Sequence, residues 1–492
     1  QELNSICKIP GLRSIIWSTK PYDFKKKRKM QASLIRLQCG VNSYDWGKIG
    51  HESVAAKFAE ATSTDDFTVK DNRPYAELQL WMGTHPSNPS KDIQTNQSLS
   101  DTIKDNHSLM STDVLNKFGN KLPFLFKVLS IGKALSIQAH PNKNLAEQLH
   151  RKDPKNYPDD NHKPEMTIAL TPFEGLCGFR PLSEIAHFLS TVPTLKKLIG
   201  NDQVQEFLSV VQKNESSEKP EAIKANKNSL KKVFQTLMNA MTEDVRSRCE
   251  ELAKDALESK AEFAGGGVPS NTGQDMADLV IRLSKQYPGD IGLFVSFFLN
   301  YVKLDTGEAM FLKADDIHAY LSGDIIECMA ASDNVVRAGL TPKFKDVNTL
   351  VEMLTYSYAP IEEQKMKPVQ YPYVTLNVAA YSSNSSVLLY DPPIEEFSVL
   401  QTNLRKTGSK ANFEQICGPS IILCTSGSGM ISTESKFEQM RKGYVYFIGA
   451  STCVVLESHG QDFITFRAFC ELQDISTIGD SGMEKDTSMS RI

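Results

Sequence analysis

Apolar and polar residues alternate most clearly in residues 135–143, Leu-Ser-Ile-Gln-Ala-His-Pro-Asn-Lys. Successive side chains of a β-strand point to opposite faces, so Ser136, Gln138 and His140 share one face and apolar residues share the other. Pro141 lacks the N–H that a central ladder needs, and we expect the strand to end there. The pattern fits either a solvent-facing strand edge or the wall of a polar site.

Two later segments favour the site. Glu165 follows a polar run at residues 160–164, and His318 and Tyr320 again have strand spacing. Together with Gln138 and His140, they supply one amide oxygen, two imidazoles and one carboxylate. Such a donor set suits Zn²⁺ and other divalent first-row metals. Spacing alone does not establish the site, because His318 lies far along the chain from the other three.

The pattern changes to a helical period between about residues 182 and 285. Thr242, followed by two acidic residues, resembles a helix N-cap, and residues 275–287 predict a helix that ends before Pro288. Two apolar stripes have the spacing of amphipathic helices. The first comprises Leu230, Val233, Phe234, Leu237, Met238 and Met241, and the second comprises Val245, Cys249, Leu252, Ala253 and Ala256.

Short strands are predicted on both sides of this helical block, for example over residues 122–129 and 135–140, and again from about 291 to 470. The candidate ligands Gln138, His140 and Glu165 precede the block and His318 follows it. We therefore expect one β domain, interrupted by helices, whose two parts share a site. The region beyond about residue 345 has only His459 in place of a ligand cluster, so we interpret it as structural.

Composition limits the possible partners and compartment. The chain has 492 residues, which predicts two or three domains, with 40% hydrophobic and 23% charged residues, as in soluble globular proteins. Its 55 basic and 59 acidic residues leave a net charge of −4, which gives no electrostatic reason to bind nucleic acid or an anionic membrane. No apolar run is long enough to span a bilayer. Nine cysteines without a C-x-x-C pair favour a reducing compartment, and we expect the cytosol.

The two ends of the chain differ in composition from the rest. A basic run at residues 25–29 precedes Met30, and residues 471–492 are polar. The run could be a nuclear address or part of a transit peptide. We favour a disordered extension over residues 1–33, or sequence upstream of a start at Met30, and a polar tail over residues 471–492.

Longer motifs identify a family resemblance over roughly residues 34 to 470. The chain resembles the type I phosphomannose isomerases of eukaryotes. The resemblance rests on Tyr-Asp-Trp-Gly-Lys at 44–48, Trp-Met-Gly-Thr-His-Pro at 81–86, Leu-Pro-Phe-Leu-Phe-Lys-Val-Leu-Ser at 122–130, Gln-Tyr-Pro-Gly-Asp-Ile-Gly at 286–292 and Ser-Asp-Asn-Val-Val-Arg-Ala-Gly-Leu-Thr-Pro-Lys-Phe at 332–344. One departure is the insertion of Gln79-Leu80 before Trp81. An insertion of two residues preserves strand parity and leaves the faces downstream unchanged.

The resemblance implies a mainly β fold with an α-helical insertion. The catalytic domain would be a cupin, a jelly-roll barrel, built from residues 34–181 and 289–345. A helical domain over residues 182–288 would interrupt it, and a second, cupin-like barrel would occupy residues 346–470.

The resemblance also implies reversible isomerisation of mannose 6-phosphate and fructose 6-phosphate through a cis-enediol, which feeds mannose activation for glycosylation. Gln138, His140, Glu165 and His318 would hold one Zn²⁺ per chain. Arg337 is the family's catalytic arginine by its position in the motif, and an always-protonated guanidinium suits enediolate or phosphate oxygens. We expect a monomer that acts on a small hexose phosphate, with no nucleic acid or membrane partner.

The remaining site residues have less definite roles. Lys163 could act as the base if its pKa is depressed, and His162 could assist ring opening. Asp333 and Glu327 are possible acid/base or orienting carboxylates. Ser136, Tyr320 and Lys343 are assigned to the substrate, Lys343 to its phosphate, whereas Trp46 and Trp81 are interpreted as core.

Two other functions remain open at this point. A cupin oxygenase would use two histidines and a carboxylate for iron, which this chain also has, although the amide donor and the Arg337 and Lys343 cations fit a phosphosugar better. A non-catalytic metal-binding cupin is the third possibility. Retention of Arg337 beside all four candidate ligands argues against it.

Overall fold

The computed structural model describes residues 33–40, 46–62, 68–72, 80–214 and 216–472. They all belong to one compact unit, which begins at Ser33. The predicted basic run, nearly all of the polar tail and Gln79 of the insertion lie outside the described residues, whereas Leu80 is fully buried. No helix within the described residues is long and apolar enough to cross a membrane.

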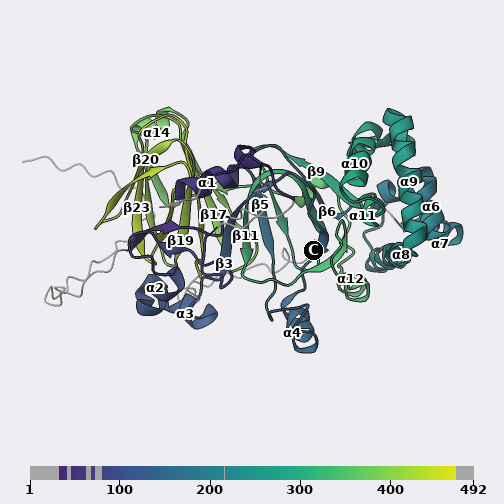
Figure 1. Cartoon of the computed structure of the whole chain (residues 1–492), viewed down its shortest axis with the longest axis horizontal. Coiled ribbons are helices and arrows are strands. Elements are labelled where there is room, and N and C mark those ends of the chain that lie inside the picture. The colour runs from purple at the N-terminus through teal and green to yellow at the C-terminus, as the bar shows by residue number, and fades with distance from the viewer. Residues whose placement is uncertain (1–32, 41–45, 63–67, 73–79, 215, 473–492) are drawn as a thin grey trace, which may run out of the picture. The chain divides into compact units, whose positions relative to one another are not determined.

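A nine-stranded curled sheet forms the middle of Figure 1 and carries the predicted site residues. Its strands within the described residues are β3 (Phe124–Ile131), β4 (Ile137–Ala139), β5 (Glu165–Ala169), β6 (Phe173–Phe179), β9 (Leu299–Leu304), β10 (Ala309–Leu312), β11 (His318–Ala330), β12 (Val336–Gly339) and β13 (Lys365–Met366). The predicted strands at 122–129 and 135–140 are confirmed, with bounds displaced by about two residues.

The long strand β11 joins the two halves of this sheet. Its first half pairs with β4 and β6, and its second half pairs with β3 and β5, all antiparallel. Four strands from before the helical block therefore hydrogen-bond to one strand that follows it. This confirms that a single β domain is interrupted by helices.

A bulge in β11 changes which residues face the barrel interior. Strict alternation from His318 would direct Tyr320 inward and Glu327 outward. In the structure Tyr320 pairs with Gly175, and Ser322 pairs with Glu174, the next residue of β6. Two steps along β11 thus match one step along β6, so β11 carries one extra residue. One extra residue reverses the alternation. Both ends of β11 consequently direct polar side chains into the same cavity.

The helical block lies between β6 and β9 and gathers at one side of the sheet (Figure 1). It contains α5 (Leu182–Thr191), α6 (Pro193–Ile199), α7 (Asn201–Asn214), α8 (Pro220–Met238), α9 (Thr242–Ser259) and α10 (Gly273–Gln286), and the short α11 (Gly292–Val295) follows it. The two predicted stripes are buried on α8 and α9 except at two positions. Met241 is 73% exposed, and Ala253 is half-buried.

The helix boundaries also correct one detail of the sequence interpretation. Thr242 is the first residue of α9, and Met241 occupies the N-cap position without a side-chain hydrogen bond. The capping box lies instead at α10, where Thr272 and Asp275 each accept a hydrogen bond from the other's backbone N–H. Asp275 was assigned to this helix from sequence, and its role in the cap was not foreseen.

Four helices in the first β-rich region were missed by the sequence interpretation. They are α1 (Val54–Thr62), α2 (Leu99–Asp105), α3 (Thr112–Phe118) and α4 (Lys143–Lys152). Each is ten residues or shorter, so its apolar period is brief. The N-caps of α2, α3 and α4 nevertheless follow the usual rule: Ser98, Ser111 and Asn142 accept backbone N–H bonds.

The C-terminal half forms two further sheets, seen beside the first sheet in Figure 1. One has eight described strands: β14 (Val369–Gln370), β16 (Ser386–Tyr390), β17 (Ser398–Leu404), β24 (Phe463–Phe469), β19 (Ser420–Ser426), β22 (Val445–Ile448), β1 (Leu34–Gln38) and β2 (Lys91–Asp92). The other has five: β15 (Val374–Leu376), β18 (Lys410–Ile416), β23 (Thr452–Ser458), β20 (Ser428–Ser432) and β21 (Phe437–Arg441). The N-terminal strand β1 thus pairs with β22 of the C-terminal half, although it precedes the catalytic strands in sequence.

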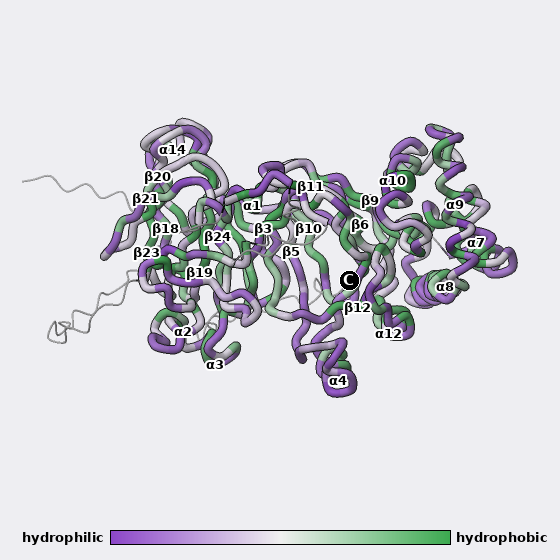
Figure 2. Tube along the Cα trace, in the orientation of Figure 1, coloured by the Kyte–Doolittle hydropathy of each residue, from purple (hydrophilic) through white to green (hydrophobic). Residues whose placement is uncertain are grey.

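Three of the four apolar clusters within the described residues lie mainly among the sheets. Leu129 and Ile131 of β3 lie in the cluster inside the first barrel. The alternate residues Phe126 and Val128 lie in a cluster that also contains Phe447 of β22, so the two barrels share a core. A third cluster fills the C-terminal barrel. Figure 2 shows the contrast between hydrophobic strands such as β3 and the mostly hydrophilic helix α4.

Gly323 in β11 provides a test of the bulge. It has φ +113°, and a Cβ there would lie 2.7 Å from the carbonyl oxygen of Pro172. Gly323→Ala should therefore lower the free energy of unfolding by more than Gly307→Ala, because Gly307 has φ +90° but no atom within 4 Å of its Cβ position. We expect about 1–3 kcal/mol from φ strain in both variants, plus a clash in the first only. Equal denaturation midpoints for the two variants would contradict this account.

Candidate metal centre

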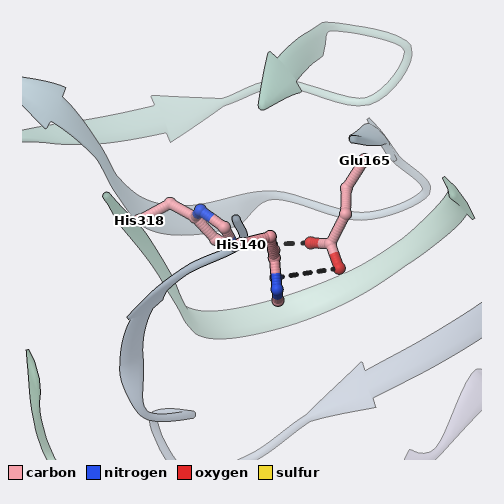
Figure 3. Close-up of side chains that lie close together, drawn as sticks. All are labelled: His140, Glu165 and His318. Carbon is pink, nitrogen blue, oxygen red and sulfur yellow. Dashed lines mark ion pairs between the residues drawn. The ribbon is translucent and has the colours of Figure 1, made fainter. Parts of the chain in front are cut away.

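Three buried side chains meet inside the first barrel: His140, just after β4, Glu165 at the start of β5 and His318 at the start of β11. Each is 1% exposed. The Nε2 atom of His140 lies 3.3 Å from Oε1 of Glu165, and Nε2 of His318 lies 3.4 Å from Oε2. Figure 3 shows the carboxylate directed at both rings, with ion pairs dashed. Their candidate ligand atoms all lie within 4.8 Å of one another.

Backbone hydrogen bonds orient both imidazoles. The Nδ1 atom of His140 lies 2.6 Å from the carbonyl oxygen of Asn334, and Nδ1 of His318 lies 3.2 Å from that of Asp316. A carbonyl oxygen only accepts, so in each ring Nδ1 carries the proton and Nε2 presents a lone pair. Within the described residues, Nε2 of His318 is buried without a hydrogen-bond partner.

This arrangement fits a cation. Two nitrogen lone pairs face the negative carboxylate of Glu165 at 3.3 and 3.4 Å, which is unfavourable unless a positive centre lies between them. Backbone carbonyls that fix the tautomer of a histidine are the usual support of a metal ligand. His140, Glu165 and His318 could therefore hold a divalent metal ion.

Gln138 adjoins the same group. Its Nε2 lies 3.4 Å from Nε2 of His140, and its Oε1 accepts a hydrogen bond of 3.0 Å from Ser136 Oγ. Backbone pairing places Gln138 between His318 on β11 and Arg337 on β12. It is a neutral amide beside the cluster, and its role as a fourth ligand stays a prediction.

Burial and charge shape the protonation of the cluster. Burial, with the nearby Lys163 charge, lowers the pKa of His140 to about 4, so its ring stays neutral near pH 7. Burial by itself would raise the pKa of Glu165, but the nearby Lys163 charge holds that pKa well below its usual range. A neutral imidazole and an ionised carboxylate are the forms that bind metals.

Tyr320 supports Glu165. Its hydroxyl donates to Glu165 Oε2 at 3.1 Å and accepts from Thr167 Oγ1 at 2.8 Å. Burial and the Glu165 charge raise the pKa of Tyr320 well above its usual range, so the phenol keeps its proton. The sequence interpretation assigned Tyr320 to the sugar, and the structure gives it this additional contact.

A cavity of about 370 Å³ opens beside the cluster. Eight of the predicted site residues line it: Ser136, Gln138, Lys163, Glu165, Tyr320, Glu327, Arg337 and Lys343. His140 and His318 lie behind this wall, fully buried. The volume is within the range of small-ligand sites.

His162 and Asp333 are not among the residues that line the cavity. His162 Nε2 lies 2.6 Å from Glu396 Oε1, on the segment that leads into β17. Asp333 is exposed and pairs with His85 at 3.3 Å. Each finds a partner in a distant part of the chain that sequence spacing could not indicate, and contact with substrate is not supported for either.

The pKa of Lys163 is shifted in the direction opposite to the one that its predicted role as a base requires. Burial by itself would lower its pKa, but the carboxylates of Glu165, Glu327 and Asp333 raise it above the usual value. The depressed pKa on which the base role depended is thus absent. Lys163 is a buried cation 3.3 Å from Glu165 Oε1.

Sequence reasoning missed several lining residues, among them Lys127, Lys133 and Tyr287, and it assigned Trp46 to the core. Lys127 is 5% exposed and forms an ion pair of 2.8 Å with Glu327. The sequence did contain a signal for Lys127, because a buried lysine in the mostly apolar strand β3 needs a partner for its charge. Lys133 and Tyr287 carried no such signal.

The fold and the site define a cupin with a candidate metal site: a curled β-barrel that presents two imidazoles and one carboxylate in its interior. Comparison with known families is more specific. Residues 34–182 match the catalytic domain of phosphomannose isomerase type I, residues 198–299 its helical insertion domain, and residues 387–436 its C-terminal region.

Relatives cover nearly the whole chain. Mannose-6-phosphate isomerase of Emericella nidulans is 60% identical over 454 residues, which is 90% of this chain and 98% of that protein. The Saccharomyces cerevisiae enzyme of the same name is 46% identical, with 90% and 100% covered. A crystal structure of mannose 6-phosphate isomerase from Salmonella typhimurium, bound to fructose 6-phosphate and zinc, has TM-score 0.71 and 32% identity, and covers 90% of this chain and 100% of that one. The chain belongs to the type I phosphomannose isomerase family and is an enzyme of that family.

Removing one imidazole tests the metal centre. His318→Ala should weaken metal binding by more than about 100-fold. Loss of a residue that only supports a ligand already lowers metal affinity by roughly 10- to 100-fold. Elemental analysis of the dialysed protein gives the metal content per chain. His459→Ala, an exposed histidine of the C-terminal barrel, is the matched control and should retain the metal. Full occupancy in His318→Ala would remove this histidine from the ligand set.

Proposed function

We propose that this chain is a mannose-6-phosphate isomerase that interconverts mannose 6-phosphate and fructose 6-phosphate through a cis-enediol. The supporting observation is that one cavity contains both a metal-ligand cluster and cations without carboxylate partners. An aldose–ketose isomerase must hold a phosphate, stabilise a developing oxyanion and move a proton between neighbouring carbons. The cavity has groups suited to each of these tasks.

We assign one Zn²⁺ per chain to Gln138, His140, Glu165 and His318. Imidazole and carboxylate donors suit zinc, and the zinc-containing relative described above supports this choice. When bound, the ion supplies a Lewis acid for the sugar oxygens at C-1 and C-2.

Arg337 and Lys343 are the groups assigned to substrate anions. In the part of the chain that the structure describes, neither has a carboxylate within ion-pair distance, although both line the cavity. Burial lowers the pKa of Arg337 somewhat, yet a guanidinium remains protonated at any working pH. Arg337 is assigned to the enediolate oxygen and Lys343 to the phosphate.

Proton transfer falls to Glu327, a candidate that lines the cavity. Lys163 also lines the cavity, but its raised pKa keeps it protonated and unsuited to act as a base. Glu327 is held by Lys127 at 2.8 Å, and a fixed carboxylate beside C-1 and C-2 meets the geometric requirement of a general base.

A cupin oxygenase and a non-catalytic metal-binding module are the competing functions. The His140, Glu165 and His318 set would also serve iron, but an oxygenase has no need for several cations at the cavity wall. The retained cavity and its charged residues argue against a purely structural barrel. Turnover without oxygen separates the isomerase from an oxygenase, and any turnover excludes the structural module.

We further propose a monomeric enzyme of the cytosol whose mannose 6-phosphate feeds mannose activation for glycosylation. Six cysteines of the described residues are buried free thiols, which suits a reducing compartment: Cys39, Cys177, Cys249, Cys328, Cys424 and Cys470.

A coupled assay in heavy water tests the reaction and its course together. The zinc-loaded chain should convert mannose 6-phosphate to fructose 6-phosphate without oxygen, lose activity with a chelator and regain it with zinc. Product formed in heavy water should contain deuterium, because an enediol exchanges its migrating proton with solvent and a direct hydride shift does not. Absence of isomerisation would refute the function, and absence of deuterium would refute the enediol.

Arg337→Ala should reduce kcat by about 10²–10³-fold, the usual cost of removing an oxyanion-stabilising donor, while the metal content stays unchanged. Arg337→Lys should recover part of the loss because it restores charge without the bidentate geometry. Arg405→Ala, an exposed arginine of the C-terminal barrel, is the control. If Arg337→Ala turns over at the wild-type rate, Arg337 has no part in the reaction.

A further inference from the structure

Lys133 is a third cavity cation without a carboxylate partner. It lies in the short connection between β3 and β4 and lines the cavity together with Arg337 and Lys343. No carboxylate of the described residues lies within ion-pair distance of its ammonium group, whereas the other two lysines of the barrel wall, Lys127 and Lys163, are paired with Glu327 and Glu165. Its positive charge is therefore available to a ligand.

An aromatic ring restrains Lys133 without neutralising it. The Nζ atom lies 4.3 Å from the ring centroid of Tyr287, which is cation–π geometry. Such a contact fixes a flexible side chain and leaves its N–H donors and its charge free. Both residues are half-buried, so an anion bound there would be partly screened from water.

The helical insertion holds this pair in position. Tyr287 OH donates to the carbonyl oxygen of Ala134 at 2.5 Å, and Gln286 Oε1 accepts from the Ala134 N–H at 3.1 Å. Both polar groups of the residue that follows Lys133 are thus bound to the end of α10. Burial raises the pKa of Tyr287 to about 12, which keeps its hydroxyl a donor.

Lys133 also lies where the site cavity meets a second cavity of about 690 Å³. Lys133, Tyr287, Thr341 and Pro342 line both. None of the candidate metal ligands lines the second cavity. Lys133 is therefore suited to the end of a substrate that lies away from the reacting carbons.

We propose that Lys133 binds the phosphate group of the hexose phosphate and that Tyr287 is the positioning residue that orients it. The proposal rests on the proposed isomerase function and adds a phosphate ligand whose placement depends on the helical insertion. A dianionic phosphate would then bind Lys133 together with Lys343, and the barrel would supply the chemistry.

Lys133→Met tests the ligand role. Loss of a charged hydrogen-bond partner should raise KM for mannose 6-phosphate and the Kd for inorganic phosphate by about 10- to 100-fold. Because the contact exists before and after the proton moves, kcat should change less than about threefold. Metal content should not change. Lys133→Arg should recover most of the affinity.

The matched control is Lys345→Met. Lys345 lines the second cavity but not the site cavity, so its loss should leave both constants within about twofold of the wild type. If Lys345→Met and Lys133→Met weaken phosphate equally, the effect is general electrostatic attraction and the proposal is wrong.

Tyr287→Leu and Tyr287→Phe test the positioning role. The first removes the ring and should raise KM like Lys133→Met, with no further rise in the double variant, because the two residues act as a unit. The second keeps the ring and should have a smaller effect. Additive losses in the double variant would refute the coupling.

The outcomes separate the two proposals. If Lys133→Met lowers kcat with KM unchanged, or changes nothing in an active enzyme, the phosphate role is overturned and the isomerase function stands. If the wild-type chain shows no isomerisation, calorimetric titration with inorganic phosphate still reports on Lys133. An unchanged Kd for Lys133→Met would then overturn this inference separately.

Discussion

The buried carboxylate of Glu165 imposes the constraint on which the site depends. It is 1% exposed and faces two imidazole nitrogens that both present lone pairs. Burying a negative charge is costly unless it is compensated, and hydrogen bonds from Tyr320 and the Lys163 ammonium supply only part of the compensation. A metal ion bound at this cluster would complete it, and metal binding would then add to the stability of the fold.

The strand β11 makes that convergence possible. It pairs with strands from before the helical insertion along its whole length, and its first residue is the candidate ligand His318. The bulge then reverses its alternation and brings Glu327 to the same cavity, opposite Lys127 on β3. One strand thus supplies both His318 of the candidate metal cluster and the cavity carboxylate of Glu327, which a regular strand could not do.

The helical insertion contributes to the site rather than merely interrupting the barrel. Near its start, the fully buried Arg180 donates to Glu184 and Asn271, which anchors the helices to the end of β6. Near its end, the Asp290 carboxylate accepts from the N–H groups of Leu340 and Thr341, at the segment that carries Lys343. The segment that carries the cavity residue Lys343 is consequently held by a residue at the end of the insertion.

The sequence by itself determined the class of fold and the chemistry available. The polar face of residues 135–140, the isolated His318 and the change from strand to helix period are local patterns, and the metal ligands, Arg337 and the split barrel could be inferred from them and from the family motifs. The tertiary structure decided which charged groups reach the cavity. His162 and Asp333 bind Glu396 and His85 instead, while Lys127 and Lys133 line the wall. These outcomes depend on contacts between segments far apart in sequence, and the direction of Glu327 depends on a one-residue bulge. No local period encodes either.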